Sequence, residues 1–85
     1  MRVNDQIRGF ITRELLHGEA DASLSDDESL LERGILDSLG LLQMLAFLEQ
    51  EYHLTVEDQD IVPENFESIR AITALVQRRQ NGAAA

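Results

Sequence analysis

Residues 37–53 read DSLGLLQMLAFLEQEYH and predict one long helix that begins at Ser38 and ends near His53. Asp37 is placed to cap this helix, because an aspartate just before a helix can accept hydrogen bonds from the N–H groups of the first turn and its charge complements the helix dipole. Apolar side chains recur along the helix in two stripes. We assign the first stripe to the core, and it consists of Leu41, Met44, Leu45, Leu48 and Tyr52.

The second apolar stripe consists of Leu39, Leu42 and Ala46 and lies on a different side of the same predicted helix. One interpretation is that the helix runs through the centre of the domain and buries both stripes. The other is that the second stripe is exposed near Ser38 and receives partner proteins, because exposed apolar patches commonly mark interaction sites. We favour the second interpretation.

The sequence before residue 37 predicts a first helix and a long loop. Apolar residues at helical spacing predict an amphipathic helix over residues 4–17, with Asn4 or Asp5 as its cap and Gly18 at its end. Residues 19–37 are polar and turn-prone but contain several leucines. Loops of this length in compact domains are usually functional or disordered, and the embedded leucines indicate a loop that is anchored to the core.

The sequence after residue 53 predicts two more helices. A short third helix starts at Thr55 or Glu57 and stops before Pro63, because the residue preceding a proline disfavours the helical conformation. Apolar residues at helical spacing then predict a last amphipathic helix over residues 67–79. Residues 81–85 read NGAAA, and we expect a disordered C-terminal tail there.

Length and composition indicate one all-α domain. The chain has 85 residues, with one proline, five glycines and no cysteine. This length excludes a second domain, and we place the single domain at residues 1–80. Many leucines and few aromatic residues suit packed helices better than a sheet sandwich. Without cysteine, neither a disulfide framework nor a thiolate metal site can add stability.

The charge of the chain limits its partners. Sixteen acidic residues against seven basic ones give a formal net charge of −9. Such a surface repels phosphate backbones and anionic lipid headgroups, so we expect no nucleic-acid partner. The acidity either steers basic proteins toward the chain or merely keeps it soluble. No apolar run is long enough for a signal peptide or a membrane span, which predicts a cytoplasmic location without a membrane span.

The sequence contains no recognisable catalytic or metal site. Ser38 lacks the glycine that a nucleophile elbow has two residues before its serine, because Leu36 stands there. His17 and His53 are the available general bases, and each lies near a predicted helix end, where a histidine commonly interacts with the helix dipole. The acidic residues 26–28 lack the alternating ligands and the central glycine of a calcium loop. We therefore expect no enzyme, no catalytic residue and no bound metal.

Ser38 itself has two interpretations. A phosphodiester formed on its hydroxyl would place negative charge at the positive end of the predicted helix, where N–H groups favour anions. Asp37 opposes that charge, but it caps the helix and can offer a contact to the metal or basic residues of a modifying enzyme. From position alone, the favoured interpretation of Ser38 is an ordinary polar residue at a helix start.

The chain resembles the acyl carrier protein family, including its peptidyl and D-alanyl carrier relatives, over nearly its whole length. The resemblance rests on Asp37-Ser38-Leu39 at the helix start, on Leu42, Leu45, Leu48, Glu49 and Tyr52 after it, on Ile61-Val62, and on Phe66-Glu67-Ser68-Ile69 with Ile72. It implies a four-helix bundle of the acyl-carrier type with a long first loop and a short third helix. The helices predicted from periodicity agree with that fold.

The resemblance also implies a cofactor and its attachment point. Ser38 would receive 4'-phosphopantetheine from coenzyme A through a phosphopantetheinyl transferase, with Asp37 as helix cap and part of the modification motif. The thiol of the arm would hold cargo as a thioester, which accounts for a chain without cysteine, and the carrier itself would catalyse nothing. The residues expected to contact partner enzymes are Leu39, Leu42, Gln43, Ala46, Glu49, Ile61 and Val62.

The expected cargo differs from that of fatty-acid carriers. Those carriers typically have one residue between the glycine and Asp-Ser and acidic residues soon after the serine, whereas Ile35 and Leu36 follow Gly34 here, and Gly40 and Gln43 replace the acids. This form looks more like D-alanyl carriers and stand-alone carriers of amino acids or specialised acyl groups. We expect a monomer that is loaded by an adenylating acyl or aminoacyl ligase and used by a downstream transferase or synthase. The alternatives are an acyl carrier of fatty-acid or polyketide synthesis and an unmodified helical interaction module.

Overall fold

The computed structural model describes residues 2–18 and 24–84, with the side chains of residues 81–84 outside the description. Its elements are α1 (Val3–Phe10), the π-helical continuation η1 (Ile11–Leu15), α2 (Ser38–Tyr52), the 3-10 turn η2 (Asp58–Asp60), α3 (Pro63–Phe66) and α4 (Ile69–Ala84). The described residues contain no strand. The predicted all-α, four-helix domain with a long first loop and a short third helix is confirmed.

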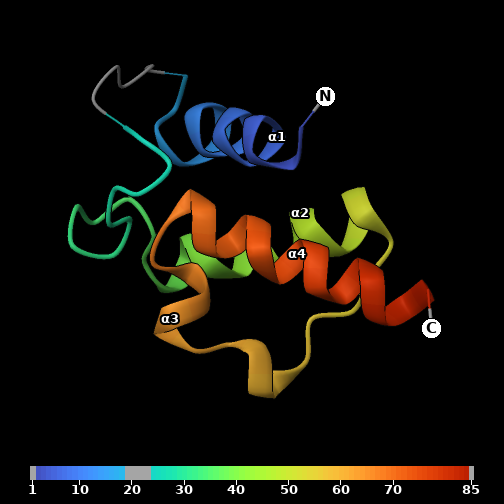
Figure 1. Ribbon diagram of the computed structural model, residues 1–85. Coiled ribbons are helices and arrows are strands. Elements are labelled where there is room, and N and C mark those ends of the chain that lie inside the picture. The colour runs from blue at the N-terminus through green and yellow to red at the C-terminus, as the bar shows by residue number, and fades with distance from the viewer. Residues whose placement is uncertain (1, 19–23, 85) are drawn as a thin grey trace.

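Helix α4 is the element against which the others pack (Figure 1). It contacts α1, α2 and α3, and in this view α2 lies behind it. The core is apolar and draws on all four helices, on η1 and on the first loop. Its buried residues are Ile7, Phe10, Ile11, Leu24, Leu30, Leu36, Met44, Leu48, Phe66, Ile69, Ile72, Leu75 and Val76.

The first loop is anchored to the core, as its leucines predict. Leu24, Leu30 and Leu36 are buried. The Leu30 N–H donates to the carbonyl of Glu67 at 2.7 Å, which ties the loop to the segment that leads into α4. These contacts fix the position of the loop and therefore of the start of α2, which follows it. Residues 19–23, which belong to the predicted loop, lie outside the described residues.

The start of the first helix differs from the prediction. Helix α1 begins at Val3, with Arg2 in the cap position and no side-chain cap. The predicted cap by Asn4 or Asp5 is therefore wrong. The side chain of Asn4 instead donates to Asp26 Oδ2 at 2.9 Å, so a partner from the first loop takes the amide that local sequence alone would assign to capping.

The end of the first helix agrees with the prediction. Gly18 has φ of +85°, a conformation that glycine adopts without a side-chain penalty, and its N–H donates to the Thr12 carbonyl at 2.7 Å. His17 just before it also has positive φ, at 54°. The chain thus turns sharply out of η1 and into the loop.

The third helix lies later than predicted. The interval from Thr55 to Pro63 contains only η2, a single turn with a reciprocal cap between Glu57 and Asp60. Pro63 begins α3 instead of stopping a helix before it. The physical reason is that the first position of a helix has no intrahelical use for an N–H group, so a proline is tolerated there.

Helix α4 starts and ends later than predicted. Ser68 caps its start, because Ser68 Oγ accepts the N–H of Ala71 at 3.1 Å. The helix runs through Ala84, past the predicted end at residue 79 and into the segment 81–85 that was expected to be a disordered tail. Alanines favour helix enough to carry it past one glycine. None of the described helices combines the length and apolarity that a membrane span requires.

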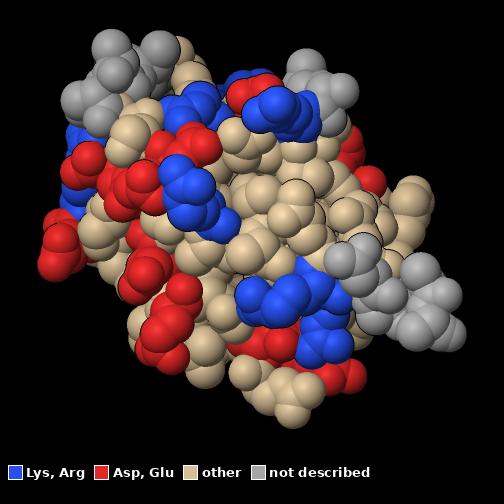
Figure 2. Space-filling view, in the orientation of Figure 1, with Lys and Arg blue, Asp and Glu red and all other residues tan. Residues whose placement is uncertain are grey.

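Arginines tie the acidic segments of the chain to its helices. Arg8 pairs with Asp26, Arg70 with Asp27, and Arg79 with Asp60. On the face drawn in Figure 2, the acidic side chains gather mainly over one side of the molecule, with arginines among them. Part of the acidic surface thus fastens the first loop and η2 to α1 and α4.

Asp26 makes the stability of the fold sensitive to acid. The hydrogen bond from Asn4 and the contacts of Arg8 hold the pKa of the Asp26 carboxyl below its usual value. The unfolded chain therefore binds a proton first, near pH 4, and the stabilisation present above that pH is lost as the pH falls through the lower folded pKa. We expect Asp26→Asn to reduce the loss of unfolding free energy between about pH 6 and pH 3. Urea unfolding of both proteins at the two pH values measures it, and equal losses would contradict it.

Candidate functional site

Ser38 is the first residue of α2, and its side chain is exposed. Asp37 precedes it in an extended conformation, and Asp37 Oδ1 accepts the N–H of Gly40 at 2.7 Å. The Asp37 carbonyl accepts the N–H of Leu41, also at 2.7 Å. The predicted helix start and its cap are confirmed. Two hydrogen bonds to Asp37 thus close the first turn of α2, and the Ser38 side chain within that turn is exposed.

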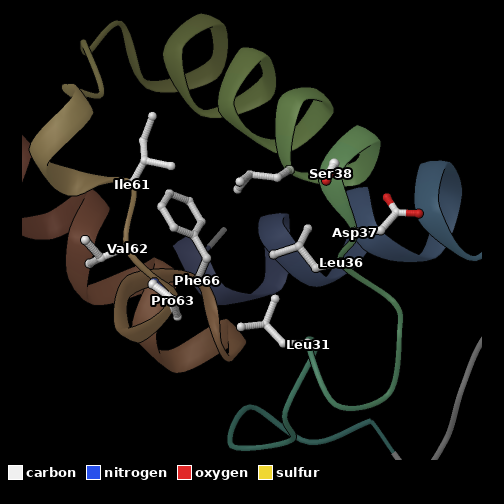
Figure 3. A pocket seen from close by; sticks show the side chains of 9 residues that line it. Leu31, Leu36, Asp37, Ser38, Ile61, Val62, Pro63 and Phe66 are labelled. Atoms are coloured by element: carbon white, nitrogen blue, oxygen red, sulfur yellow. The ribbon is translucent and has the colours of Figure 1, made fainter.

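An open apolar pocket of about 420 Å³ borders Ser38 (Figure 3). It forms where the first loop, α2 and the segment leading into α3 meet. Its lining consists of Asp37 and Ser38 together with Leu31, Leu36, Leu41, Ile61, Val62, Pro63 and Phe66. An apolar depression of this kind favours apolar groups held close to Ser38.

The two stripes of α2 differ in exposure. Leu39 and Leu42 are 65% and 63% exposed, and Ala46 is exposed as well. The interpretation that both stripes are buried is therefore wrong. In the first stripe Met44 and Leu48 are fully buried. Its other members, Leu41, Leu45 and Tyr52, are half-buried.

The residues expected to contact partners lie on two sides of Ser38. Ile61 and Val62 are half-buried and line the apolar pocket. Leu39 and Gln43 border a separate, smaller depression between η1 and the first turn of α2. Ser38 borders the apolar pocket, and Leu39 next to it borders the smaller depression. That any of these residues contacts a partner stays a prediction.

Glu49 has a bond within the fold. Its side chain is exposed near the end of α2, and Glu49 Oε2 accepts the N–H of Val56 at 3.0 Å. The carboxylate thereby fastens the segment that follows α2. That Glu49 also contacts a partner stays a prediction.

Five residues of the pocket were not predicted as site residues, namely Leu31, Leu36, Leu41, Pro63 and Phe66. Leu31 is 41% exposed and lies in the first loop, where it could not be told from the leucines that anchor the loop. Leu36 and Leu41 were expected to pack against the core, Pro63 was interpreted as a helix stop, and Phe66 was expected to fill the core just before the last helix. Within the described residues, no group of three or more His, Asp or Glu side chains is placed to hold a metal ion.

A protein-family model described as "Phosphopantetheine attachment site" matches residues 5–76, within the predicted domain 1–80. The chain belongs to this family. The carrier protein is 37% identical over 87 residues to "Probable acyl carrier protein PigG" of Serratia sp., an alignment that covers 96% of this chain and 99% of that relative. It is 24% identical to "Aminoacyl carrier protein 2" of Bradyrhizobium diazoefficiens, over 89% of this chain and 84% of the relative.

Among solved structures, the carrier protein is similar to a chain in the crystal structure of an FAD-dependent dehydrogenase. The two are 40% identical with a TM-score of 0.75, over 82% of this chain and 97% of the other. The match uses 82% of the 85 residues of this chain and still covers 97% of the other chain. The other chain is therefore a small chain of similar length to this one. The covalent cofactor of the carrier protein is phosphopantetheine.

Proposed function

We propose that Ser38 is the residue of this carrier protein that bears 4'-phosphopantetheine, and that the cargo is an amino acid or a small acyl group. The observation that carries the proposal is an exposed serine hydroxyl at the capped start of α2 beside an apolar pocket. When bound, the arm supplies a thiol that holds the cargo as a thioester. The chain itself catalyses no reaction, and its side chains orient and present the arm.

The residues around Ser38 fit such a group. The start of a helix favours an anion, because its N–H groups and its dipole present positive charge there. Asp37 Oδ1 accepts the Gly40 N–H, so this carboxylate oxygen points toward the first turn of the helix. The lining of the neighbouring pocket suits apolar atoms near Ser38.

The lack of charge in the part of α2 that follows Ser38 supports a specialised cargo over bulk fatty-acid synthesis. No residue from Ser38 to Leu48 is charged, in a chain with a net charge of −9. A partner enzyme would therefore meet an apolar stripe at Leu39 and Leu42 and not a row of carboxylates. A carrier of fatty-acid or polyketide synthesis and an unmodified helical module are the alternatives.

Three classes of partner follow from this proposal. A phosphopantetheinyl transferase would modify Ser38, an adenylating acyl or aminoacyl ligase would load the cargo, and a downstream transferase or synthase would use it.

The similarity to a chain of the dehydrogenase structure supports an FAD-dependent dehydrogenase as a second candidate for the downstream enzyme. Bleaching of flavin absorbance by the loaded carrier, but not by the free acid, would support that candidate. A cytoplasmic location and a monomeric state stay predictions.

Loading in vitro tests the proposed cargo. The protein is incubated with coenzyme A and a transferase, and then with ATP, a candidate acid and its ligase. We expect intact mass to rise by one arm and then by one amino acid or small acyl group, and hydroxylamine to remove the second increment. Loading by long-chain acids alone would contradict the cargo, and the absence of any arm would favour an unmodified module.

Leu42→Ala should separate partner binding from stability. Because Leu42 is 63% exposed, truncation should change the unfolding free energy by less than about 0.5 kcal/mol. Transfer of the arm should slow about fivefold or more if Leu42 is an apolar anchor of the partner interface. The rate of adduct formation at sub-saturating protein and the thermal midpoint measure the two effects. A large fall of the midpoint with an unchanged rate would contradict this role.

A further inference from the structure

Gly40 occupies a position where glycine has no evident conformational purpose. It is buried in the first turn of α2. Among the described residues the glycines with positive φ are Gly18 and Gly34, so the backbone of Gly40 could be adopted by any residue. Helices favour alanine over glycine. The reason for glycine at position 40 must therefore lie in the space around its Cα.

That space is closed by η1 and by the segment that leads into α2. A Cβ atom on residue 40 would lie 3.2 Å from Asp37 Oδ1, 3.4 Å from Leu15 Cδ2 and 3.6 Å from the Ile35 carbonyl oxygen. The last two distances are ordinary van der Waals contacts. The first is tighter than nine in ten real Cβ contacts, so the Asp37 carboxylate would have to move by a few tenths of an ångström.

The atom that would give way is the one that caps the helix. Asp37 Oδ1 accepts the N–H of Gly40 at 2.7 Å, so a methyl group on residue 40 would compete with the N–H of the same residue for one oxygen. Moving that oxygen weakens the cap bond. Ser38 directly follows Asp37, and its orientation depends on how the first turn is closed.

We propose that Gly40 is a positioning residue for Ser38. Its bare Cα lets the Asp37 carboxylate close the first turn of α2 against η1, and this fixes the direction in which the Ser38 hydroxyl meets a transferase. The inference rests on the proposed attachment at Ser38. It assigns Gly40 no contact with the arm or with the transferase.

The contact between residues 40 and 37 is tested on the unmodified protein. In Gly40→Ala the amide hydrogen of residue 40 should exchange roughly fivefold faster than in the wild type, after correction for intrinsic rates, because its hydrogen bond is weakened. Gly9→Ala is the matched control, since a Cβ there would meet only Arg13 Nη1, the free end of a flexible side chain. Exchange at residue 40 should not change in the control. Unchanged exchange in Gly40→Ala would overturn the inference.

The effect on Ser38 is tested by the rate of arm transfer in a double-mutant cycle. Gly40→Ala and Asp37→Ala should each lower kcat/KM about tenfold, because a hydroxyl that is held less firmly in its reactive position accepts the arm more slowly. The double variant should be little slower than either single one, because both changes remove the same support. Gly9→Ala should transfer at the wild-type rate.

The outcomes separate this inference from the proposed function. A wild-type protein that never accepts an arm overturns the proposed function and the role of Gly40 together. A modified wild type with an equally fast Gly40→Ala or Asp37→Ala variant overturns the role of Gly40 alone. The role of Gly40 is also overturned if the loss of kcat/KM in the double variant equals the product of the two single losses. Gly40 would then act independently of Asp37. If Gly40→Ala fails to fold, a wild-type rate of arm transfer to Asp37→Ala still overturns the inference.

Discussion

Ser38→Ala is expected to abolish uptake of the phosphopantetheine arm while leaving the fold intact. Ser38 is exposed at the start of α2, and the cap bond comes from Asp37 and not from the serine. Removing its hydroxyl should therefore change the unfolding free energy by less than about 0.5 kcal/mol. Intact mass after incubation with coenzyme A and a transferase measures the loss, and urea unfolding measures the stability.

Ser25→Ala is the matched control for this prediction. Ser25 is also exposed and lies in the first loop, away from the start of α2. The control should accept one arm at the wild-type rate. An adduct that still forms on Ser38→Ala would show that another residue is the attachment point, and the role proposed for the start of α2 would then be wrong.

Leu48→Ala is expected to destabilise the domain by roughly 2–5 kcal/mol. Leu48 is fully buried in the stripe of α2 that faces the core, so the truncation leaves a cavity as well as losing apolar contacts. A loss of this size is a large part of the roughly 5–15 kcal/mol that stabilises a typical domain. The midpoint and slope of urea unfolding, followed by circular dichroism, measure it.

Leu42→Ala provides the same chemical change on the same helix at an exposed position. The difference in stability between the two variants should therefore report burial and not helix propensity. Similar losses in both would contradict the assignment of Leu42 to the exposed stripe. A stable Leu48→Ala variant would contradict the assignment of Leu48 to the core.

The start of α2 could be predicted because capping is a local property. Asp37 bonds to an N–H only three residues away, and its residue type and position carry that information. The burial of the first stripe followed from periodicity as well. Periodicity alone could not decide whether Leu39 and Leu42 are exposed, because both stripes repeat at helical spacing.

The short third helix could not be placed from local sequence, because a proline can either follow a helix or begin one. Distant contacts make the choice. Phe66 is buried in the core, and the Asn65 amide donates to the Asp60 carbonyl at 2.8 Å, which joins η2 to α3. These contacts favour a helical turn that begins at Pro63.

The pocket beside Ser38 could not be predicted from the periodicity of apolar residues either. It brings Leu31 of the first loop together with Ile61 and Val62, which are far from it in the chain. The close packing around Gly40 is of the same kind, because Leu15 meets that position from η1. Local patterns therefore predicted the helix start at Ser38 and its cap by Asp37, while the surfaces near the serine depend on tertiary packing.

The most direct test of the central claim is to locate the arm on the wild-type chain. After modification, trypsin should release residues 34–70 as one peptide, because Arg33 and Arg70 flank a stretch without Lys or Arg. Fragmentation of that peptide distinguishes Ser38 from Tyr52, Thr55 and Ser68. We expect a single arm on Ser38. An arm on any other residue, or a peptide that stays unmodified beside an active transferase, would contradict the claim.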